Sequence, residues 1–283
     1  MDTILPSISP AELNALIGRA DRPWLLDVRK PEHFDGSDRV VAGAVHCAPA
    51  EVAALARELP PRDAVVYCVY GHHVCQDAVR TLRAAGWNAR WLEGGLEGGE
   101  PGEDRLVDLA RWRETPPLRM RKRPDLGVTG ERPSRWVTRA RPKIDRIACP
   151  WLVLRFIDPR AQFFYVPAGE VLDQARRLEA VAYDIEGAPI THAWEKCSFD
   201  ALMEAFDLRE PALQALATIV RGADTARLGL APQCAGLLAV SLGLSRLHAD
   251  DHAMLAAALP VYDALYAWCR GAQGETHTWK GHA

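Results

Sequence analysis

The sequence predicts two modules: an α/β module with a mainly parallel sheet flanked by helices, then a mainly α-helical module with a small sheet. In the first hundred residues, apolar runs of strand length alternate with helix-spaced stretches, which is typical of a parallel sheet covered by helices. Residues 98–142 are rich in proline, glycine and arginine, as interdomain connections are. Helical spacing dominates from residue 144 onward. A chain of 283 residues is long enough for two cores.

The first module begins with a capping box. Ser9 and Glu12 frame Pro10 at the first helical position, which predicts a helix over residues 10–20. Buried strands are expected at 23–28, 64–67 and 88–92, and helices at 50–59 and 73–85. The second of these helices ends at Gly86, a favourable helix-terminating residue.

The connection and the second module follow. One helix is expected within the connection, at 105–113. Further strands are expected at 162–166 and 180–185, and helices at 144–157, 198–206, 211–221, 232–247 and 250–269. Pro150 must start or kink the first of these helices. Residues 235–244 are apolar almost all round, which predicts a central buried helix.

Composition and cysteine use indicate a cytoplasmic protein. No apolar run reaches the roughly 18 residues that a membrane-spanning helix needs. Residues 1–4 lack a basic region followed by an apolar stretch, so we expect no secretory signal. Seven scattered cysteines, an odd number, indicate reduced thiols rather than a disulfide framework.

A basic segment separates the two modules. Residues 106–147 carry 12 basic and 5 acidic side chains, a net charge of +7, while both flanking segments are acidic. We expect a solvated linker that contacts its neighbours; an anion or a nucleic acid is the alternative partner. The nine tryptophans show no alternation with basic residues, which argues against binding of single-stranded nucleic acid.

The strongest chemical signal is a cysteine loop. The strand expected at 64–67 brings Cys68 to its carboxyl end, Gly71 follows, and a helix begins at His73. Ligands of parallel α/β sheets bind at this edge, where loop amides and the positive helix end stabilise a thiolate or persulfide. Cys68 is therefore a candidate nucleophile, and a small buried residue ending a strand is the alternative.

This arrangement resembles the rhodanese family of sulfurtransferases over about residues 9–97. The similarity rests on Leu26-Asp27-Val28-Arg29, Pro31-Glu32, Gly43-Ala44, Cys68 with Gly71, and Leu92-Glu93-Gly94-Gly95. It implies a rhodanese-like fold in which Cys68 accepts sulfane sulfur from thiosulfate or a protein persulfide. The sulfur would then pass to a thiol or cyanide without a cofactor. By the same resemblance, the substrate-binding loop comprises Val69, Tyr70, Gly71, His72 and His73; its length is the one that goes with sulfur substrates.

Two loop positions depart from the family pattern. His73 stands where the family has arginine, and Val74 where it has serine or threonine. Neutral imidazole holds an anion less firmly than a guanidinium, so activity with thiosulfate is expected to be weak. Arg29 is a candidate replacement for the missing charge, or else the ion-pair partner of Glu32 or another carboxylate. Cys75 either resolves an oxidised Cys68 or simply packs in the helix.

Polar residues gather in the second module as well. Asp184, His192 and Glu195 follow an expected strand, and Asp224 ends an expected helix. We expect Asp184, His192, Glu195 and Asp224 to converge in one pocket, with His192, Glu195 and Asp224 as ligands of a divalent metal, because buried carboxylates and imidazoles need partners or an ion. Helix caps and salt bridges are the alternative for each residue.

Cations precede the first helix of this module. We expect Arg141, Lys143 and Arg146 to form an anion site at a strand-to-helix junction, and a solvated basic face is the alternative.

From residue 135 to about 280 the sequence is similar to the C-terminal domain of bacterial chromate-resistance proteins. The similar stretches are residues 136–151, 155–159, 184–188, 197–199, 219–227 and 262–266. The resemblance implies a role in chromate response or resistance, with chromate or another oxyanion as a candidate ligand. Some relatives act as regulators, but their N-terminal region differs from the one here, so nucleic acid is not the expected partner.

These observations predict a rhodanese-like domain at residues 1–100, a basic linker at 101–134 and a chromate-resistance C-terminal domain at 135–283. The expected function is sulfur transfer through Cys68, linked to chromate. The alternative is a non-catalytic sensor of chromate or another oxidant, built on a degenerate rhodanese domain.

Overall fold

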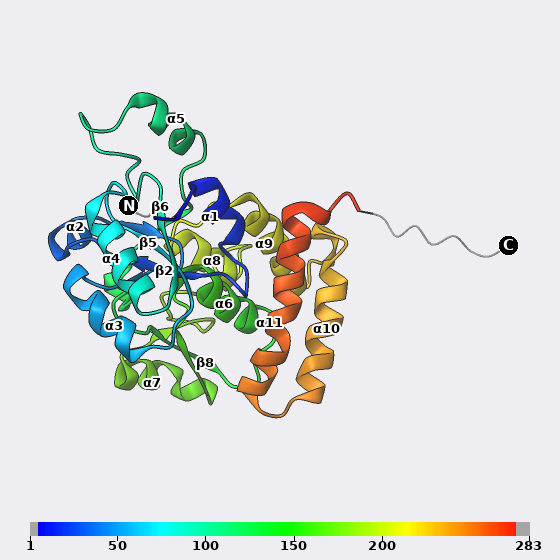
Figure 1. Cartoon of the computed structure of the whole chain (residues 1–283). Helices are drawn as coiled ribbons and strands as arrows, with labels where there is room; N and C mark the ends of the chain where they lie inside the picture. Colours follow the sequence, from blue (N-terminus) through cyan, green and yellow to red (C-terminus); the bar gives the residue numbers. More distant parts are fainter. Residues whose placement is uncertain (1–4, 276–283) are drawn as a thin grey trace.

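The computed structural model describes residues 5–275, without the side chains of residues 106, 108, 109 and 111. The opening residues 1–4, on which the signal prediction depended, lie outside this range. The two modules lie against each other, and the helix of the connection, α5 (Leu106–Glu114), projects from one end (Figure 1). No helix in residues 5–275 is long and apolar enough to cross a membrane.

The first module contains a five-stranded sheet in which every pairing is parallel, as the sequence predicts. Its order is β1 (Ser7–Ile8), β6 (Asn88–Leu92), β5 (Asp63–Tyr67), β2 (Trp24–Asp27) and β4 (Val45–His46). The three central strands are the predicted ones. The edge strands β1 and β4 have two residues each, too few for any hydrophobic period to reveal them.

The helices of this module are α1 (Pro10–Leu16), α2 (Pro31–Asp35), α3 (Val52–Glu58) and α4 (His73–Ala84), and a 3₁₀ turn, η1 (Pro49–Glu51), precedes α3. The capping box is present, since the Ser9 hydroxyl accepts from the Glu12 amide and the Glu12 carboxylate accepts from the Ser9 amide. α1 ends at Leu16, short of the predicted residue 20. The chain leaves the helix at Ile17, whose ψ is 138°, and Gly18 follows with a φ of +85°; a Cβ at Gly18 would lie only 2.5 Å from the Phe156 ring.

The two faces of the sheet enter different cores. Because successive strand residues point to opposite faces, Leu26 and Val66 belong to the cluster that packs with α3 and α4. Leu25, Val65 and Tyr67 belong instead to a cluster that continues into the second module. The two modules therefore share one apolar core.

The connecting segment contributes structure to this arrangement. α5 begins and ends within one residue of the prediction. β7 (Arg119–Arg121) then pairs antiparallel with β3 (Arg39–Val41), and the Arg121 amide donates to the Phe206 carbonyl of the second module. A 3₁₀ turn, η2 (Pro124–Leu126), follows. The segment contacts its neighbours as expected. The strand β7 was not predicted, because two of its three residues are arginines and it shows no apolar run.

The second module has a three-stranded parallel sheet in the order β10 (Val181–Ala182), β8 (Arg135–Arg139), β9 (Gln162–Val166). Its helices are α6 (Asp145–Leu152), α7 (Val171–Leu178), α8 (Ser198–Ala205), α9 (Pro211–Asp224), α10 (Cys234–Leu247) and α11 (Asp251–Ala267). The 3₁₀ turns η4 (Ala168–Glu170) and η5 (Leu228–Leu230) lie between them. α6 and α11 run on into single π-helical turns, η3 (Val153–Ile157) and η6 (Trp268–Ala272). Pro150 lies inside α6, and the chain continues past it rather than starting there.

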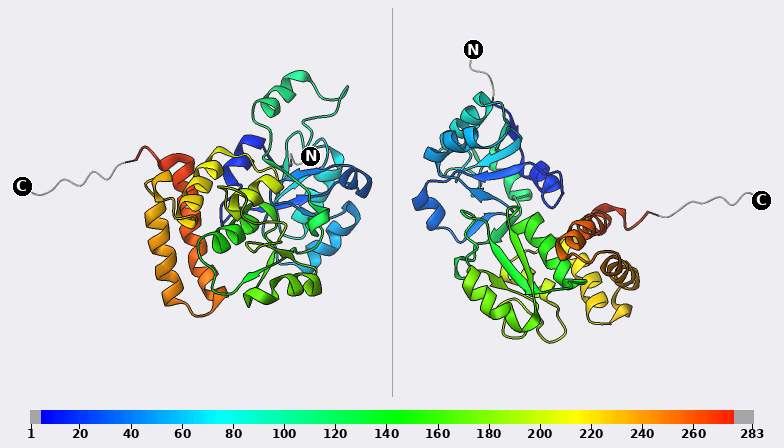
Figure 2. Two further views of the ribbon diagram at one scale, coloured as in Figure 1. Left: turned by 180° about the vertical axis from the view of Figure 1, so that it is seen from behind. Right: turned by 90° about the horizontal axis from the view of Figure 1, so that it is seen from below.

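One prediction about this module is wrong. The apolar helix α10 is not central: it lies at the outer edge of the molecule, packed beside α11 (Figures 1 and 2). Only a narrow stripe of it is buried, including Cys234 and Leu237, whereas Leu242 and Leu247 are exposed. Its apolar residues are mainly leucines, and they lie on more than one side of the helix, so not all of them meet a neighbouring element.

Candidate functional site

Cys68 lies at the floor of a cavity in the first module. It follows the last residue of β5, and α4 begins five residues later. The cavity has a volume of about 430 Å³. Its lining comprises Arg29, Lys30, His33, Cys68, Val69, Tyr70, His72, His73, Val74 and Glu100. Cys68 itself is only 6% exposed, so a reactant reaches its sulfur only from within this cavity.

The surroundings of this sulfur favour the thiolate. The Cys75 thiol and the amides of Gly71, His72 and Cys75 lower the pKa of Cys68 to about 6, although burial opposes the shift. The Cys75 thiol also faces the His72 carbonyl oxygen, 3.2 Å away. Its single hydrogen goes preferentially to the charged acceptor when Cys68 is ionised. Cys68 is thus held as a thiolate at neutral pH.

A glycine turn after β6 fixes the shape of the loop. Gly95 has a φ of +57°, and a Cβ there would lie 2.7 Å from both the Cys68 carbonyl oxygen and the Gly71 nitrogen. The Leu96 amide donates to the Cys68 carbonyl. From α5, the Trp112 indole donates to the Gly95 carbonyl at 3.1 Å. The glycine pair after Leu92 therefore lets two loops touch backbone to backbone.

Arg29 is close to the cavity but already engaged. Its guanidinium is buried and makes a bidentate ion pair with Asp27, with a shortest distance of 2.7 Å. The Tyr67 hydroxyl donates to the same carboxylate. The ion-pair alternative for Arg29 is the one observed, with Asp27 as partner rather than Glu32. No second guanidinium lines the cavity among the described residues.

The two loop histidines have different surroundings. His73 is exposed and is the first residue of α4. His72 Nε2 lies 2.9 Å from the Asp104 carboxylate and 4.0 Å from that of Glu100. Glu100 lines the cavity and Asp104 pairs with His72, so negative charge beside this loop opposes the approach of small anions.

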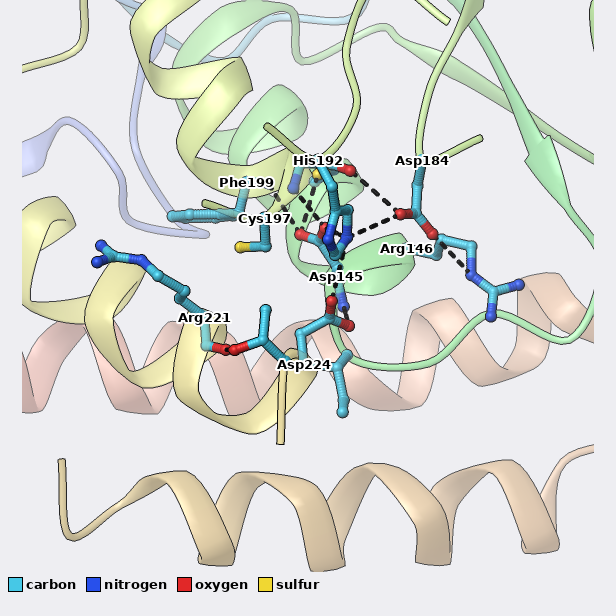
Figure 3. A network of polar contacts seen from close by, with 12 residues as sticks. Asp145, Arg146, Asp184, His192, Cys197, Phe199, Arg221 and Asp224 are labelled. Atoms are coloured by element: carbon cyan, nitrogen blue, oxygen red, sulfur yellow. Dashed lines mark hydrogen bonds and ion pairs between the residues drawn. The ribbon is translucent and has the colours of Figure 1, made fainter. Parts of the chain in front are cut away.

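A second polar cluster lies in the helical module (Figure 3). His192 Nε2 lies 3.3 Å from Asp145, 3.2 Å from Asp184 and 3.2 Å from Asp224, measured to a carboxylate oxygen of each. The hydrogen bond with Asp145 is the main cause that raises the pKa of His192 to about 9, and Asp224 and Asp184 add to it. Burial beside two other carboxylates raises the pKa of Asp224 to about 7.

The structure brings together some of the predicted ligands and not others. His192, Asp184 and Asp224 converge as expected. Glu195 does not: its carboxylate pairs with Arg227 at 3.0 Å and its side chain is 79% exposed. Sequence reasoning missed Asp145, which lies in the first turn of α6 and is almost completely buried.

The three cations predicted to bind an anion do not form one site. The Arg141 guanidinium donates to the carbonyls of residues 245, 248 and 249 and so fastens the α10–α11 turn. Lys143 is exposed. Arg146 pairs with Asp184 at 3.1 Å. Arg221, on α9, pairs with Asp200 at 2.9 Å. Arg141 and Arg146 are thus occupied by partners within the chain.

Comparisons with known proteins place both modules. Residues 9–100 match the profile of the rhodanese-like domain. A rhodanese homolog from Thermus thermophilus is 28% identical, with 33% of this chain and 99% of that one covered, at a TM-score of 0.28. A thiosulfate sulfurtransferase from Pseudomonas aeruginosa is 20% identical, with 34% and 18% covered, at a TM-score of 0.29. Together with the parallel strand order, the profile match identifies the first module as a rhodanese-like domain.

The second module matches another family. Residues 136–269 match the profile of the ChrB C-terminal domain. Protein ChrB of Cupriavidus metallidurans is 33% identical over 152 residues, which cover 50% of this chain and 45% of ChrB. The match therefore spans about half the length of that curated relative. The chain joins a rhodanese-like domain to a ChrB C-terminal domain.

Proposed function

We propose that the protein is a sulfurtransferase that carries sulfane sulfur as a persulfide on Cys68. The observation that carries this proposal is the Cys68 thiol in the lining of a cavity, where the Cys75 thiol and loop amides lower its pKa. A terminal persulfide sulfur attached to Cys68 would extend into this cavity. The amides of Gly71 and His72 that favour the thiolate would also stabilise the persulfide anion.

The reaction proceeds in two displacements. The Cys68 thiolate attacks the outer sulfur of thiosulfate, the S–S bond of the donor breaks, and sulfite leaves with its electron pair. The product is the Cys68 persulfide anion. A thiolate or cyanide then attacks the terminal sulfur, which departs as a new persulfide or thiocyanate and regenerates the Cys68 thiolate. Neither step requires a cofactor.

The charge around the cavity favours a donor other than thiosulfate. His73 replaces the arginine that the rhodanese resemblance leads one to expect, and Arg29 is neutralised by Asp27. Asp104 and Glu100 add negative charge beside His72. A dianion is therefore held weakly although Lys30 also lines the cavity, and we propose a protein persulfide as the donor.

Cyanolysis tests the proposal. The full chain should release thiocyanate over many turnovers from a persulfide donor, and mass spectrometry should find one added sulfur on Cys68. Cys68→Ser should abolish both signals. Cys47→Ser is the matched control, because Cys47 is buried in the same domain and burial raises its pKa to about 11. Added sulfur on another cysteine would overturn the assignment.

A second candidate function is an oxidant sensor, which one observation favours. The Cys75 thiol lies against the Cys68 sulfur, so an oxidised Cys68 has a neighbouring thiol with which to react. A sensor of this kind would consume one equivalent of persulfide donor and then stop. Turnover in the cyanolysis assay therefore separates an enzyme from a sensor.

The link to chromate rests on the second module. Its family resemblance implies a chromate-related role, and chromate is an oxidant that consumes thiols and mimics sulfate. Replenishing sulfane sulfur would suit a cytoplasmic protein that acts under this stress. Growth on chromate of cells carrying the Cys68→Ser chain tests the link, since a resistance role that needs sulfur transfer requires lower survival than with the unaltered chain.

A further inference from the structure

The polar cluster of the second module has a geometry that the sulfur chemistry does not explain. We propose that Asp145, Asp184 and His192 bind a divalent first-row transition-metal ion, with Asp224 beside them. This inference does not depend on the proposed function of Cys68, which lies in the other module.

The spacing of the donor atoms fits one ion. Protein oxygen and nitrogen ligands lie about 2.0–2.2 Å from such a metal, so neighbouring donors in one coordination shell stand about 3.0–3.5 Å apart. The distances from His192 Nε2 to the three carboxylates, 3.2–3.3 Å, fall in this window. Donor atoms of Asp145, Asp184 and His192 all lie within 4.8 Å of one another.

Hydrogen bonding alone does not account for this convergence. A ring nitrogen carries at most one hydrogen and forms one strong hydrogen bond. Three carboxylates from three separate elements nevertheless face the same Nε2 atom (Figure 3). Within residues 5–275, Asp224 has, besides His192, only the Asp145 amide at 3.4 Å. Asp224 therefore has the fewest donors of the three carboxylates, and a bound cation would supply the partner that it lacks.

Neighbouring residues orient the carboxylates through hydrogen bonds and ion pairs, as they do around the ligands of known metal sites. Asp145 accepts from the amides of Ser198 and Phe199 at the start of α8. One oxygen of Asp184 is held by Arg139 and Arg146, while the other faces His192. Such outer hydrogen bonds orient metal ligands, and their loss typically weakens binding 10–100-fold.

The donor set also indicates which ion to use as a probe. Carboxylates with one imidazole suit Mn²⁺, Fe²⁺ and Zn²⁺, whereas thiolates prefer softer ions. Cys149 and Cys197 lie close by, and burial raises the pKa of both thiols. Mn²⁺ is the sharper probe, because it avoids the seven cysteines of the chain. His192 is 41% exposed, which leaves the ion a way in from solvent.

The test is a titration of the full chain, without a histidine tag, with Mn²⁺ followed by electron paramagnetic resonance. We expect one ion per chain at micromolar concentration. His192→Ala should weaken binding at least tenfold, and the isosteric Asp224→Asn several-fold. Glu195→Gln is the matched control, because Glu195 is paired with Arg227 instead, and it should bind as the unaltered chain does. Circular dichroism confirms that each variant is folded.

Two results would overturn the proposal. Absence of Mn²⁺ binding by the unaltered chain would mean that a protonated His192 completes the cluster as an ion-pair network. Equal binding by the unaltered chain, His192→Ala and Asp224→Asn would place the ion elsewhere. If His192→Ala does not fold, the comparison of Asp224→Asn with Glu195→Gln decides in the same way.

Discussion

The Cys75 thiol is the largest single cause of the low pKa of Cys68, and removing it has a calculable effect. Cys75→Ala deletes one hydrogen bond to a charged acceptor, which contributes about 1.5–3 kcal/mol. At 1.36 kcal/mol per pKa unit, this raises the pKa of Cys68 by about 1–2 units. The starting value is about 6, so the variant should titrate between about 7 and 8.

The rate of alkylation by iodoacetamide measures this change, because only the thiolate reacts. At pH 7 a thiol of pKa 6 is about nine-tenths ionised, and one of pKa 8 about one-tenth, so the rate should fall up to about tenfold. Peptide mass spectrometry assigns the label to Cys68. Burial raises the pKa of Cys47 and Cys269 to about 11, so these thiols react slowly at this pH.

Cys75→Ser is the matched control, because its hydroxyl keeps a donor at the same position. It should titrate closer to the unaltered chain than Cys75→Ala does. If Cys75→Ala leaves the midpoint of the alkylation profile near pH 6, the loop amides alone determine the ionisation of Cys68 and our reasoning about the thiol pair is wrong.

Three further predictions concern the loop, the turn that supports it and the outer helix. His73→Arg should raise the rate with thiosulfate several-fold at pH 8, where histidine is neutral and a guanidinium is not; an unchanged or lower rate would mean that this side chain does not reach the substrate. Gly95→Ala should lower the free energy of unfolding in urea by at least about 1 kcal/mol more than Gly102→Ala, because both positions have a left-handed φ but only Gly95 faces backbone atoms; equal losses would contradict the close approach. In the same assay, Leu247→Ser should lower the free energy of unfolding by less than about 0.5 kcal/mol and Leu237→Ser by more than about 2 kcal/mol, since the two side chains are 78% and 4% exposed. The reverse order would mean that the outer side of α10 is the buried one.

Local patterns were sufficient to predict the elements around Cys68. The apolar run of β5, the loop glycine and the helical spacing of α4 all lie within about twenty consecutive residues, so short-range rules apply. The capping box at Ser9 is local in the same sense. The end of α1 was placed too late, because Ile17 and Gly18 leave the helix where Gly18 packs against Phe156 of the other module.

The polar cluster shows why long-range convergence escaped sequence reasoning. Glu195 was chosen because it is close to His192 along the chain, yet it pairs with Arg227 instead. Asp145 precedes its partners by about forty to eighty residues, and only the packing of α6 against α8 and α9 brings them together. Acidic residues are common in the first turn of a helix, where they offset its positive end, so the position of Asp145 gave no sign of a site. The apolar composition of α10 likewise led to a wrong prediction of burial. Composition does not show which side of a helix packs against a neighbouring element.

Leu25, Val65 and Tyr67 belong to an apolar core that continues into the other module, and this continuity affects how the protein unfolds. Unfolding of either module exposes apolar residues of the other to water. The two modules should therefore unfold together. Heating should therefore give one calorimetric peak rather than two. A protease that cuts the connection would leave two fragments that still adhere. The rhodanese-like domain and the second module, which begins at β8, therefore form one folding unit.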